Sequence, residues 1–176
     1  GYDPKLFTKK TLSIFFSKSK CKLKPLNHNL IDEIWHRKFK KNNNKFFALP
    51  DYSVGEQYKS KIKKIAFFIN KRKADFFLVT ASENNAWLLN IRGCDSKYTP
   101  IPHSYILIDK NKRLIFFCDL KKISISLKKK FKEVYFKDIK SLDKVLSQIN
   151  KKKFIIDRNT CSLFLEKIIL KNNKIL

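Results

Sequence analysis

Hydrophobic residues recur along this chain with two spacings. Every third or fourth position is apolar in some segments, which is typical of a helix with one buried face. Helices are predicted after Pro4, after Asn29, and over 54–72, 82–89, 139–149 and 161–170. Alternating or continuous apolar runs predict strands at 21–24, 74–80, 104–108, 113–118, 134–136 and 154–156. Because helices and strands alternate, we expect an α/β fold with a mixed β-sheet flanked by helices.

Three of these strand segments have a predictable place in the sheet. The run 74–80 is almost entirely apolar and rich in β-formers, so it should be covered on both faces and lie at the centre of the sheet. The strands 104–108 and 113–118 flank a polar turn and should form an antiparallel hairpin. A polar loop is expected over 38–45.

Local signals predict where helices begin and end. Asn29 can cap the helix that follows it, and the run Ser53-Val54-Gly55-Glu56 has the Ser-x-x-Glu form of a capping box. Ser82 is expected to cap the helix that contains Trp87. Gly93 is well suited to end that helix in the left-handed conformation.

Length and composition indicate one domain taken from a larger protein. A chain of 176 residues with 43% hydrophobic content can build one sizeable core. Its apolar runs are too short for a membrane-spanning helix. The chain opens with Gly1 and contains no methionine, so we expect a piece of a longer protein. The four cysteines show no Cys-x-x-Cys spacing, which favours reduced thiols in the cytoplasm, although the sequence leaves a disulfide open.

The net charge of +25 raises the possibility of a nucleic-acid partner. Only five of the 40 basic residues are arginine, the side chain that recognises phosphates and bases in a bidentate manner. The lysines are spread over the whole chain, which favours a generic solvated surface and no specific nucleic acid. A basic nucleic-acid-binding α/β module remains the alternative, and it should show a contiguous basic face with exposed aromatic side chains.

Several sequence motifs resemble one enzyme family. The strongest is Ala86-Trp87-Leu88-Leu89-Asn90-Ile91-Arg92-Gly93-Cys94-Asp95, and weaker matches are Gly1-Tyr2-Asp3-Pro4, Asn29 to Arg37, and Gly55 with Lys61-Ile62. Together they resemble the Xaa-Pro aminopeptidases (aminopeptidase P), of the creatinase/prolidase family. The resemblance runs from Gly1 to about Asp119 and more loosely to Leu170. The chain departs from the family pattern at Lys38, where a proline is usual, and at Ser82-Glu83, where Leu-Asp is frequent.

The resemblance implies the middle, non-catalytic domain of a three-domain enzyme. Residues 1–12 would be a junction and connecting helix from a preceding domain, 13–170 an α/β domain with a ribonuclease-H-like motif, and 171–176 a junction toward an absent catalytic domain. The parent enzyme would release the first residue of peptides whose second residue is proline. It would be a cytoplasmic homodimer, and its partners would include the preceding domain, the catalytic domain and proline-containing peptides.

The resemblance implies that the catalytic and metal-binding residues of the parent enzyme lie outside this chain. Such enzymes use two divalent metal ions, usually manganese, that activate a bridging water and polarise the scissile carbonyl. The family's ligands are two Asp, one His and two Glu of the catalytic domain, and none of those segments is present here. We therefore predict no catalytic or metal-binding residue in this chain, and we expect the chain to be inactive alone.

Six residues of the matched motifs are candidates for a structural or functional role. Asn90, Arg92 and Asp95 could contact another domain or shape substrate access. Their position at a helix end equally allows Asn90 to cap the backbone and Arg92 to form a salt bridge with Asp95. Trp35 and Trp87 lie on apolar helical faces and are expected in the core, with Gly93 as a structural residue.

An active nuclease of ribonuclease-H type is a third hypothesis. It would need several carboxylates gathered around magnesium at the edge of the sheet. Asp75, Asp109 and Asp119 are the available candidates, but Asp75 begins a strand and Asp109 belongs to a turn. We therefore expect them not to converge.

Overall fold

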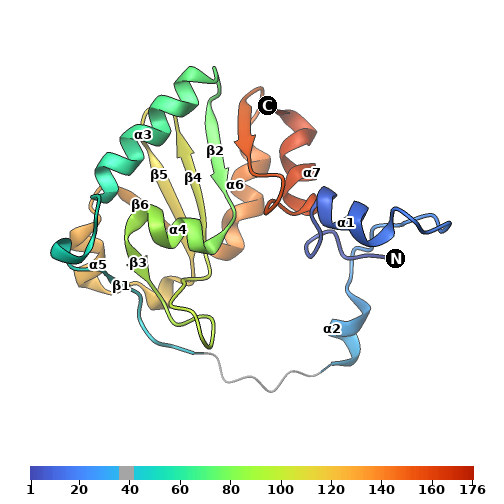
Figure 1. Cartoon of the computed structure of the whole chain (residues 1–176), viewed down its shortest axis with the longest axis horizontal. Helices are drawn as coiled ribbons and strands as arrows, with labels where there is room; N and C mark the ends of the chain where they lie inside the picture. Colours follow the sequence, from blue (N-terminus) through green and yellow to red (C-terminus); the bar gives the residue numbers. More distant parts are fainter. Residues whose placement is uncertain (36–41) are drawn as a thin grey trace.

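A six-stranded sheet organises the chain in the computed structural model, which describes residues 1–35 and 42–176 (Figure 1). The strand order is β6-β5-β4-β2-β7-β8. The strands are β2 (Phe76–Val79), β4 (Tyr105–Asp109), β5 (Leu114–Cys118), β6 (Val134–Asp138), β7 (Lys153–Ile156) and β8 (Lys174–Ile175). β4 is antiparallel to β2 and β5, whereas the other neighbours are parallel. The predicted mixed sheet, its central strand and its hairpin are all confirmed.

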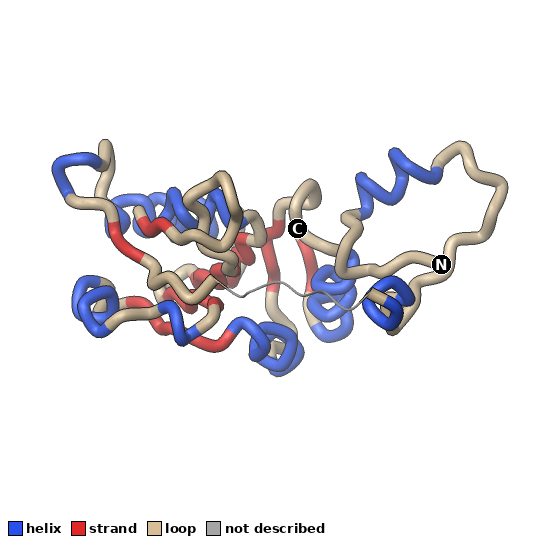
Figure 2. Tube along the Cα trace, turned by 90° about the horizontal axis from the view of Figure 1, so that it is seen from below, coloured by secondary structure: helices blue, strands red, loops and turns tan. Residues whose placement is uncertain are grey.

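Helices cover both faces of the sheet, as the view in Figure 2 shows. One face carries α3 (Tyr58–Lys71), α4 (Ser82–Leu89) and α5 (Ile125–Lys130), and the other carries α6 (Leu142–Gln148) and α7 (Leu163–Asn172). Successive strand residues point to opposite faces, so Ile106 and Ile108 join the first core while Leu107 joins the second. The helices predicted over 139–149 and 161–170 are confirmed.

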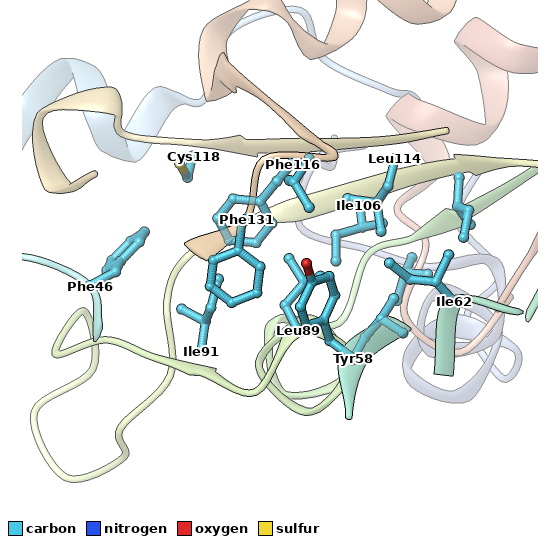
Figure 3. Close-up of a cluster of buried hydrophobic side chains, with 14 of the residues drawn as sticks. Phe46, Tyr58, Ile62, Leu89, Ile91, Ile106, Leu114, Phe116, Cys118 and Phe131 are labelled. Carbon is cyan, nitrogen blue, oxygen red and sulfur yellow. The ribbon is translucent and has the colours of Figure 1, made fainter. Parts of the chain in front are cut away.

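The core beneath α3 and α4 is built largely from aromatic and branched side chains (Figure 3). The rings of Tyr58 and Phe131 lie with centroids 4.8 Å apart, and those of Phe46 and Phe116 lie 6.5 Å apart. Phe116 and Phe131 are almost completely buried. Burying a side chain of this size stabilises a fold by about 1.5–3 kcal/mol, so this layer holds the first group of helices in place.

The amino-terminal segment packs beside α7. It contains α1 (Lys9–Phe16) and α2 (Leu30–Ile34), neither of which has a buried residue. The N–H of Leu163 donates to the carbonyl of Phe7 at 2.8 Å, and the N–H of Phe164 donates to Pro4 at 3.0 Å. Asn29 caps α2 through the N–H of Ile31, as predicted. Figure 1 shows α2 lying apart from the sheet.

Four local predictions are wrong. Residues 21–24 form no strand, and the next residue, Pro25, makes only an isolated bridge with Tyr2. Ser53 forms no capping box but ends a 3-10 turn, and α3 begins after Gln57 without a side-chain cap. Ser82 is the first residue of α4 and not its cap.

The fourth wrong prediction concerns the left-handed residue after α4. None of the glycines has a positive φ, so Gly93 does not take this conformation. Asn90 takes it instead, with φ 53°, and ends α4 three residues earlier. Asparagine adopts the left-handed region more readily than most residues, which explains why it can stand in for glycine there.

The shortest strands were not predicted from the hydrophobic periodicity. β1 (Phe47–Ala48) pairs antiparallel with β3 (Ile91–Arg92) in a separate ribbon. β8 pairs with β7, so the sheet extends into the segment 171–176 that was expected to be a junction. His36, Arg37 and the first part of the predicted loop 38–45 lie outside the described residues. Among the helices of the described ranges, none is long and apolar enough to cross a membrane.

Candidate functional site

The strongest sequence motif, residues 86–95, runs from the last turn of α4 through β3. Asn90 ends the helix, and its backbone N–H bonds to the carbonyls of Ala86 and Trp87. The prediction that Asn90 caps the backbone is confirmed. A left-handed residue at this point turns the chain away from the helix axis, so β3 can pair with β1.

Asn90 also joins α4 to three other segments. Its Oδ1 accepts a hydrogen bond from Nζ of Lys61 on α3 at 2.6 Å. Its Nδ2 donates to the carbonyl of Glu56 at 2.9 Å, and its own carbonyl accepts from the N–H of Leu49 at 2.9 Å. One side chain and its backbone therefore fix the relative positions of β1, the loop before α3, α3 and α4.

Lys61 is the buried partner in this arrangement, with only 4% of its surface exposed. Its ammonium donates to the carbonyl of Trp87 at 2.7 Å and lies 4.2 Å from the centre of the Trp87 ring. Burial lowers the pKa of Lys61, while the nearby carboxylate of Glu56 opposes that shift. The site thus holds a lysine whose hydrogen bonds and ring contact compensate for lost water.

Sequence reasoning did not single out Lys61 as a site residue, although a signal was present. The inner face of α3 buries Tyr58, Ile62 and Ile69. Lys61 stands within this stripe at helical spacing, one residue before Ile62. A lysine inside an otherwise apolar helical face indicates a buried cation with a polar partner.

The prediction that Trp35 and Trp87 are core residues is wrong. Trp87 is 56% exposed and Trp35 is 52% exposed. On α4 the inward positions are taken by Asn85, Leu88 and Leu89, which leaves the intervening Trp87 turned outward over Lys61. Trp35 follows the short helix α2, which lies away from the main core.

The predicted salt bridge between Arg92 and Asp95 is also wrong. Arg92 turns back to α4 and donates to the carbonyls of Ala86 and Ile91 at 3.1 and 3.0 Å. The C-terminal end of a helix carries a partial negative charge and attracts a cation, which is consistent with the contact to Ala86 in the last turn of α4. Asp95 instead forms an ion pair with the nearly buried Lys122 and accepts from the N–H of His103 at 2.7 Å.

Gly93 is needed for close packing rather than for backbone freedom. A Cβ atom at this position would lie 2.9 Å from the ring of Phe46 and 2.9 Å from Cα of Pro102. Both distances are shorter than real Cβ contacts allow. The structural role predicted for Gly93 therefore has a steric cause in this fold.

The three carboxylates of the nuclease hypothesis are not gathered. Asp75 and Asp109 lie at one end of the sheet, whereas Asp119 follows β5 at the opposite end. Asp75 is engaged by Lys110 and Lys153, and Asp109 accepts hydrogen bonds within its own turn. Within the described ranges no three His, Cys, Asp or Glu residues are grouped to hold a metal ion, so the residues present do not fit a metal centre.

Comparisons with known proteins agree with the sequence resemblance. Residues 37–176 match the family model described as the creatinase/prolidase N-terminal domain. Xaa-Pro aminopeptidase ApepP of Drosophila melanogaster is 30% identical over 120 residues, covering 66% of this chain and 20% of that protein. Xaa-Pro aminopeptidase 1 of Dictyostelium discoideum is 35% identical over 95 residues, covering 50% and 15%. The chain thus spans about a fifth of the length of these curated relatives.

A solved structure shows the same fold. The X-prolyl aminopeptidase of Caenorhabditis elegans, described as a cytosolic enzyme with a di-nuclear active site, superimposes with a TM-score of 0.86 at 22% identity. The match covers 99% of this chain and 30% of that protein. On the family match and the Xaa-Pro aminopeptidase relatives together, the chain belongs to the creatinase/prolidase N-terminal domain family.

Proposed function

We propose that the chain is a non-catalytic domain of a longer Xaa-Pro aminopeptidase, which releases the first residue of peptides with proline second. One observation carries the proposal: nearly all of this chain matches less than a third of a di-nuclear aminopeptidase. The parent is then a cytoplasmic metallopeptidase with two divalent ions, usually manganese, in a separate catalytic domain. No residue in the part of the chain that the structure describes is assigned to the metals, since the donor groups there do not fit a metal centre.

The domain plan expected from the sequence is part of this proposal. Residues 1–12 connect to a preceding domain, 13–170 form the support domain, and 171–176 lead toward the catalytic domain. The contacts of α7 with the residues before α1 are consistent with a fixed entry of the chain. A homodimeric parent is proposed on the family resemblance alone.

The surface formed by Trp87, Arg92 and Phe47 is the proposed contact with the catalytic domain. Phe47 and Arg92 are opposite each other in the β1–β3 ribbon, so their side chains share a face. Phe47 is 49% exposed and Trp87 is 56% exposed. Tryptophan and arginine are enriched among the residues that dominate binding energy at interfaces.

Asn90 and Asp95 act on this surface through other residues. Asn90 and Lys61 hold the segment that carries Trp87, and the Lys61 ammonium lies against the Trp87 ring. Asp95, paired with Lys122, holds the loop that follows Arg92. We therefore assign both as positioning residues rather than as residues that touch substrate.

The test compares the chain with its parent enzyme. The 176-residue chain with added manganese should cleave no Xaa-Pro peptide, and the reading frame that encodes it should continue into the Asp, Asp, His, Glu, Glu ligand set. In the full parent, Trp87→Ala should lower kcat/KM about tenfold, the equivalent of about 1.4 kcal/mol. Turnover by the isolated chain would refute the support role.

A matched control separates the proposed interface from a general loss of aromatic surface. Tyr135 is 62% exposed on the edge strand β6, far in sequence from the candidate surface. Tyr135→Ala in the parent should leave kcat/KM unchanged. If both substitutions had the same effect, the assignment of Trp87 to the interface would be wrong.

A further inference from the structure

Basic residues from four separate segments of this chain meet at one end of the sheet: the end of α3, the β4–β5 turn, the start of β7 and the start of β8. Asp75 shows how: its N–H donates to the carbonyl of Lys153 at 2.8 Å, and its carbonyl accepts from the N–H of Lys110 at 3.1 Å. Its carboxylate accepts from the N–H of Lys153 at 3.0 Å and pairs with the ammonium of Lys110 at 3.0 Å. One aspartate therefore joins the β4–β5 turn and the start of β7 to the start of β2.

Neighbouring contacts extend this end of the sheet. The side chain of Asn70, near the end of α3, donates to the carbonyl of Lys110 at 3.1 Å. The N–H of Lys174 donates to the carbonyl of Lys152 at 2.9 Å, which places β8 alongside. In Figure 1 the end of α3 and the start of β2 lie together at the top of the molecule.

We call the exposed basic residues of this end the basic rim. They are Lys71, Arg72, Lys73, Lys110, Lys112, Arg113, Lys151, Lys152, Lys153 and Lys174. The acidic residues in the same segments are Asp75 and Asp109, and both are already engaged in hydrogen bonds. Among the described residues, only Lys110 of the rim has an ion-pair partner. The rim is therefore a dense patch of uncompensated positive charge.

Three rim lysines occupy backbone positions that suit glycine better. Lys73, Lys112 and Lys151 have φ angles of 52°, 70° and 54°. Apart from Asn90, they are the non-glycine residues with positive φ in the described chain. A residue with a Cβ atom is disfavoured in the left-handed region, so each of these lysines adds charge to the rim at some expense in stability.

Aromatic side chains border the rim on α3. Phe67 is 69% exposed and stands one helical turn before Lys71. Phe68 is 38% exposed, and the guanidinium of Arg72 lies 5.4 Å from its ring centre. A basic surface with exposed aromatic rings is the combination that binds single-stranded nucleic acid, where lysines contact phosphates and rings stack on bases.

We propose that the basic rim, with Phe67 beside it, binds single-stranded nucleic acid through its phosphate backbone and without sequence preference. Eight of the ten rim residues are lysines, and the guanidinium of Arg72 lies against the Phe68 ring. Lysine is a point charge that contacts phosphate without the bidentate geometry used to read bases, so sequence selectivity is not expected. The rim itself is cationic rather than apolar, which favours phosphates in solution over insertion into a lipid surface. The inference is independent of the proposed function, since the rim lies apart from the Trp87 surface.

The test uses the 176-residue chain and a fluorescent single-stranded oligouridylate, titrated at several salt concentrations. The variant K73G/K112G/K151G removes three rim charges. It places glycine where the backbone is left-handed, so it should fold at least as well as the unmodified 176-residue chain. Its dissociation constant should rise about tenfold or more at low salt. The slope of log K against log salt should fall by about two, because each single-strand contact contributes about 0.7.

The matched control is K18G/K20G/K22G, which removes the same charge from an exposed loop after α1. Its binding and salt slope should stay within a factor of about two of the unmodified chain. Phe67→Ala should weaken binding as well, since stacking contributes about 1–3 kcal/mol per base. Equal losses in the rim variant and the control would overturn the proposal, as would absence of binding at about 0.15 M salt.

Vesicles that contain about one third phosphatidylserine supply the competing test. The proposal expects no rim-dependent binding to them at physiological salt. Binding to vesicles that is lost in K73G/K112G/K151G, with oligouridylate binding unaffected by the same changes, would overturn the proposal in favour of an anionic membrane.

Discussion

Replacing Lys61 with methionine tests the candidate site, because this one side chain links α3 to the end of α4. Methionine has a similar length but offers no hydrogen-bond donor. The change leaves the carbonyl of Trp87 and the Oδ1 of Asn90 without the ammonium that now lies 2.7 and 2.6 Å from them. The Trp87 ring also loses its cation.

The expected loss of stability is the balance of three contributions, of which two favour lysine and one favours methionine. Two hydrogen bonds from a charged donor contribute about 3–6 kcal/mol together, and the ring contact adds about 1 kcal/mol. Against this, the methionine variant no longer buries an ammonium group, which recovers a few kcal/mol of desolvation free energy. We expect Lys61→Met to lower the free energy of unfolding by about 2–3 kcal/mol.

Urea unfolding followed by far-ultraviolet circular dichroism measures this change. The matched control is Lys63→Met, an exposed position on the same helix, which should change stability by less than about 0.5 kcal/mol. Asn90→Gly keeps the left-handed backbone and removes the amide, so a double-mutant cycle with Lys61→Met isolates their interaction. A coupling near zero, or a Lys61→Met variant as stable as the control, would refute the reasoning.

Three further predictions concern packing, acid stability and thiol reactivity. Gly93→Ala should destabilise the fold by about 1–3 kcal/mol through steric overlap, whereas Gly55→Ala, with nothing within 4 Å of its Cβ, should be neutral or slightly stabilising in the same urea assay. Burial raises the pKa of Asp75, but hydrogen bonds from Lys153 and Lys110 outweigh burial, so the net shift is downward. Because the pKa of Asp75 is lower in the folded chain than in the unfolded chain, its carboxylate stabilises the fold at neutral pH, and that stabilisation is lost as pH falls through the lowered pKa. Asp75→Asn should therefore lose less stability on acidification than the unmodified chain, as measured by urea unfolding at a series of acidic pH values. Burial raises the pKa of Cys118 and Cys161 to about 12, so a thiol reagent at pH 8 should modify them only after denaturation, and rapid reaction in the folded chain would contradict their placement.

Much of the fold could be predicted from local patterns. The β4–β5 hairpin has apolar strands on both sides of a polar turn, and β2 is apolar on both faces because helices cover both sides of it. Asn29 was predicted as a cap because its side chain can accept from the backbone two residues later. Short elements such as β1 and β8 could not be predicted, since two residues carry no periodicity and form strands only beside a partner.

The candidate site was only partly predictable. The motif named Trp87, Asn90 and Arg92, but the side-chain partners of Asn90 and Arg92 come from contacts that the spacing does not reveal. Arg92 was expected to pair with Asp95, the nearest acid after it in sequence, and it donates instead to the backbone carbonyls of Ala86 and Ile91. Asp95 pairs with Lys122, 27 residues away.

The amino-acid sequence by itself determined the class of fold, the order of the main helices and strands, and the family, because periodicity and motifs are local properties of the chain. The tertiary structure alone decided which charges meet. Eight lysines that are far apart in the sequence lie together in the basic rim, because the end of α3, the β4–β5 turn and the starts of β7 and β8 meet at one end of the sheet. Electrostatic attraction depends on distance in space, so neither the basic rim nor the partners of the buried Lys61 could be derived from the sequence alone.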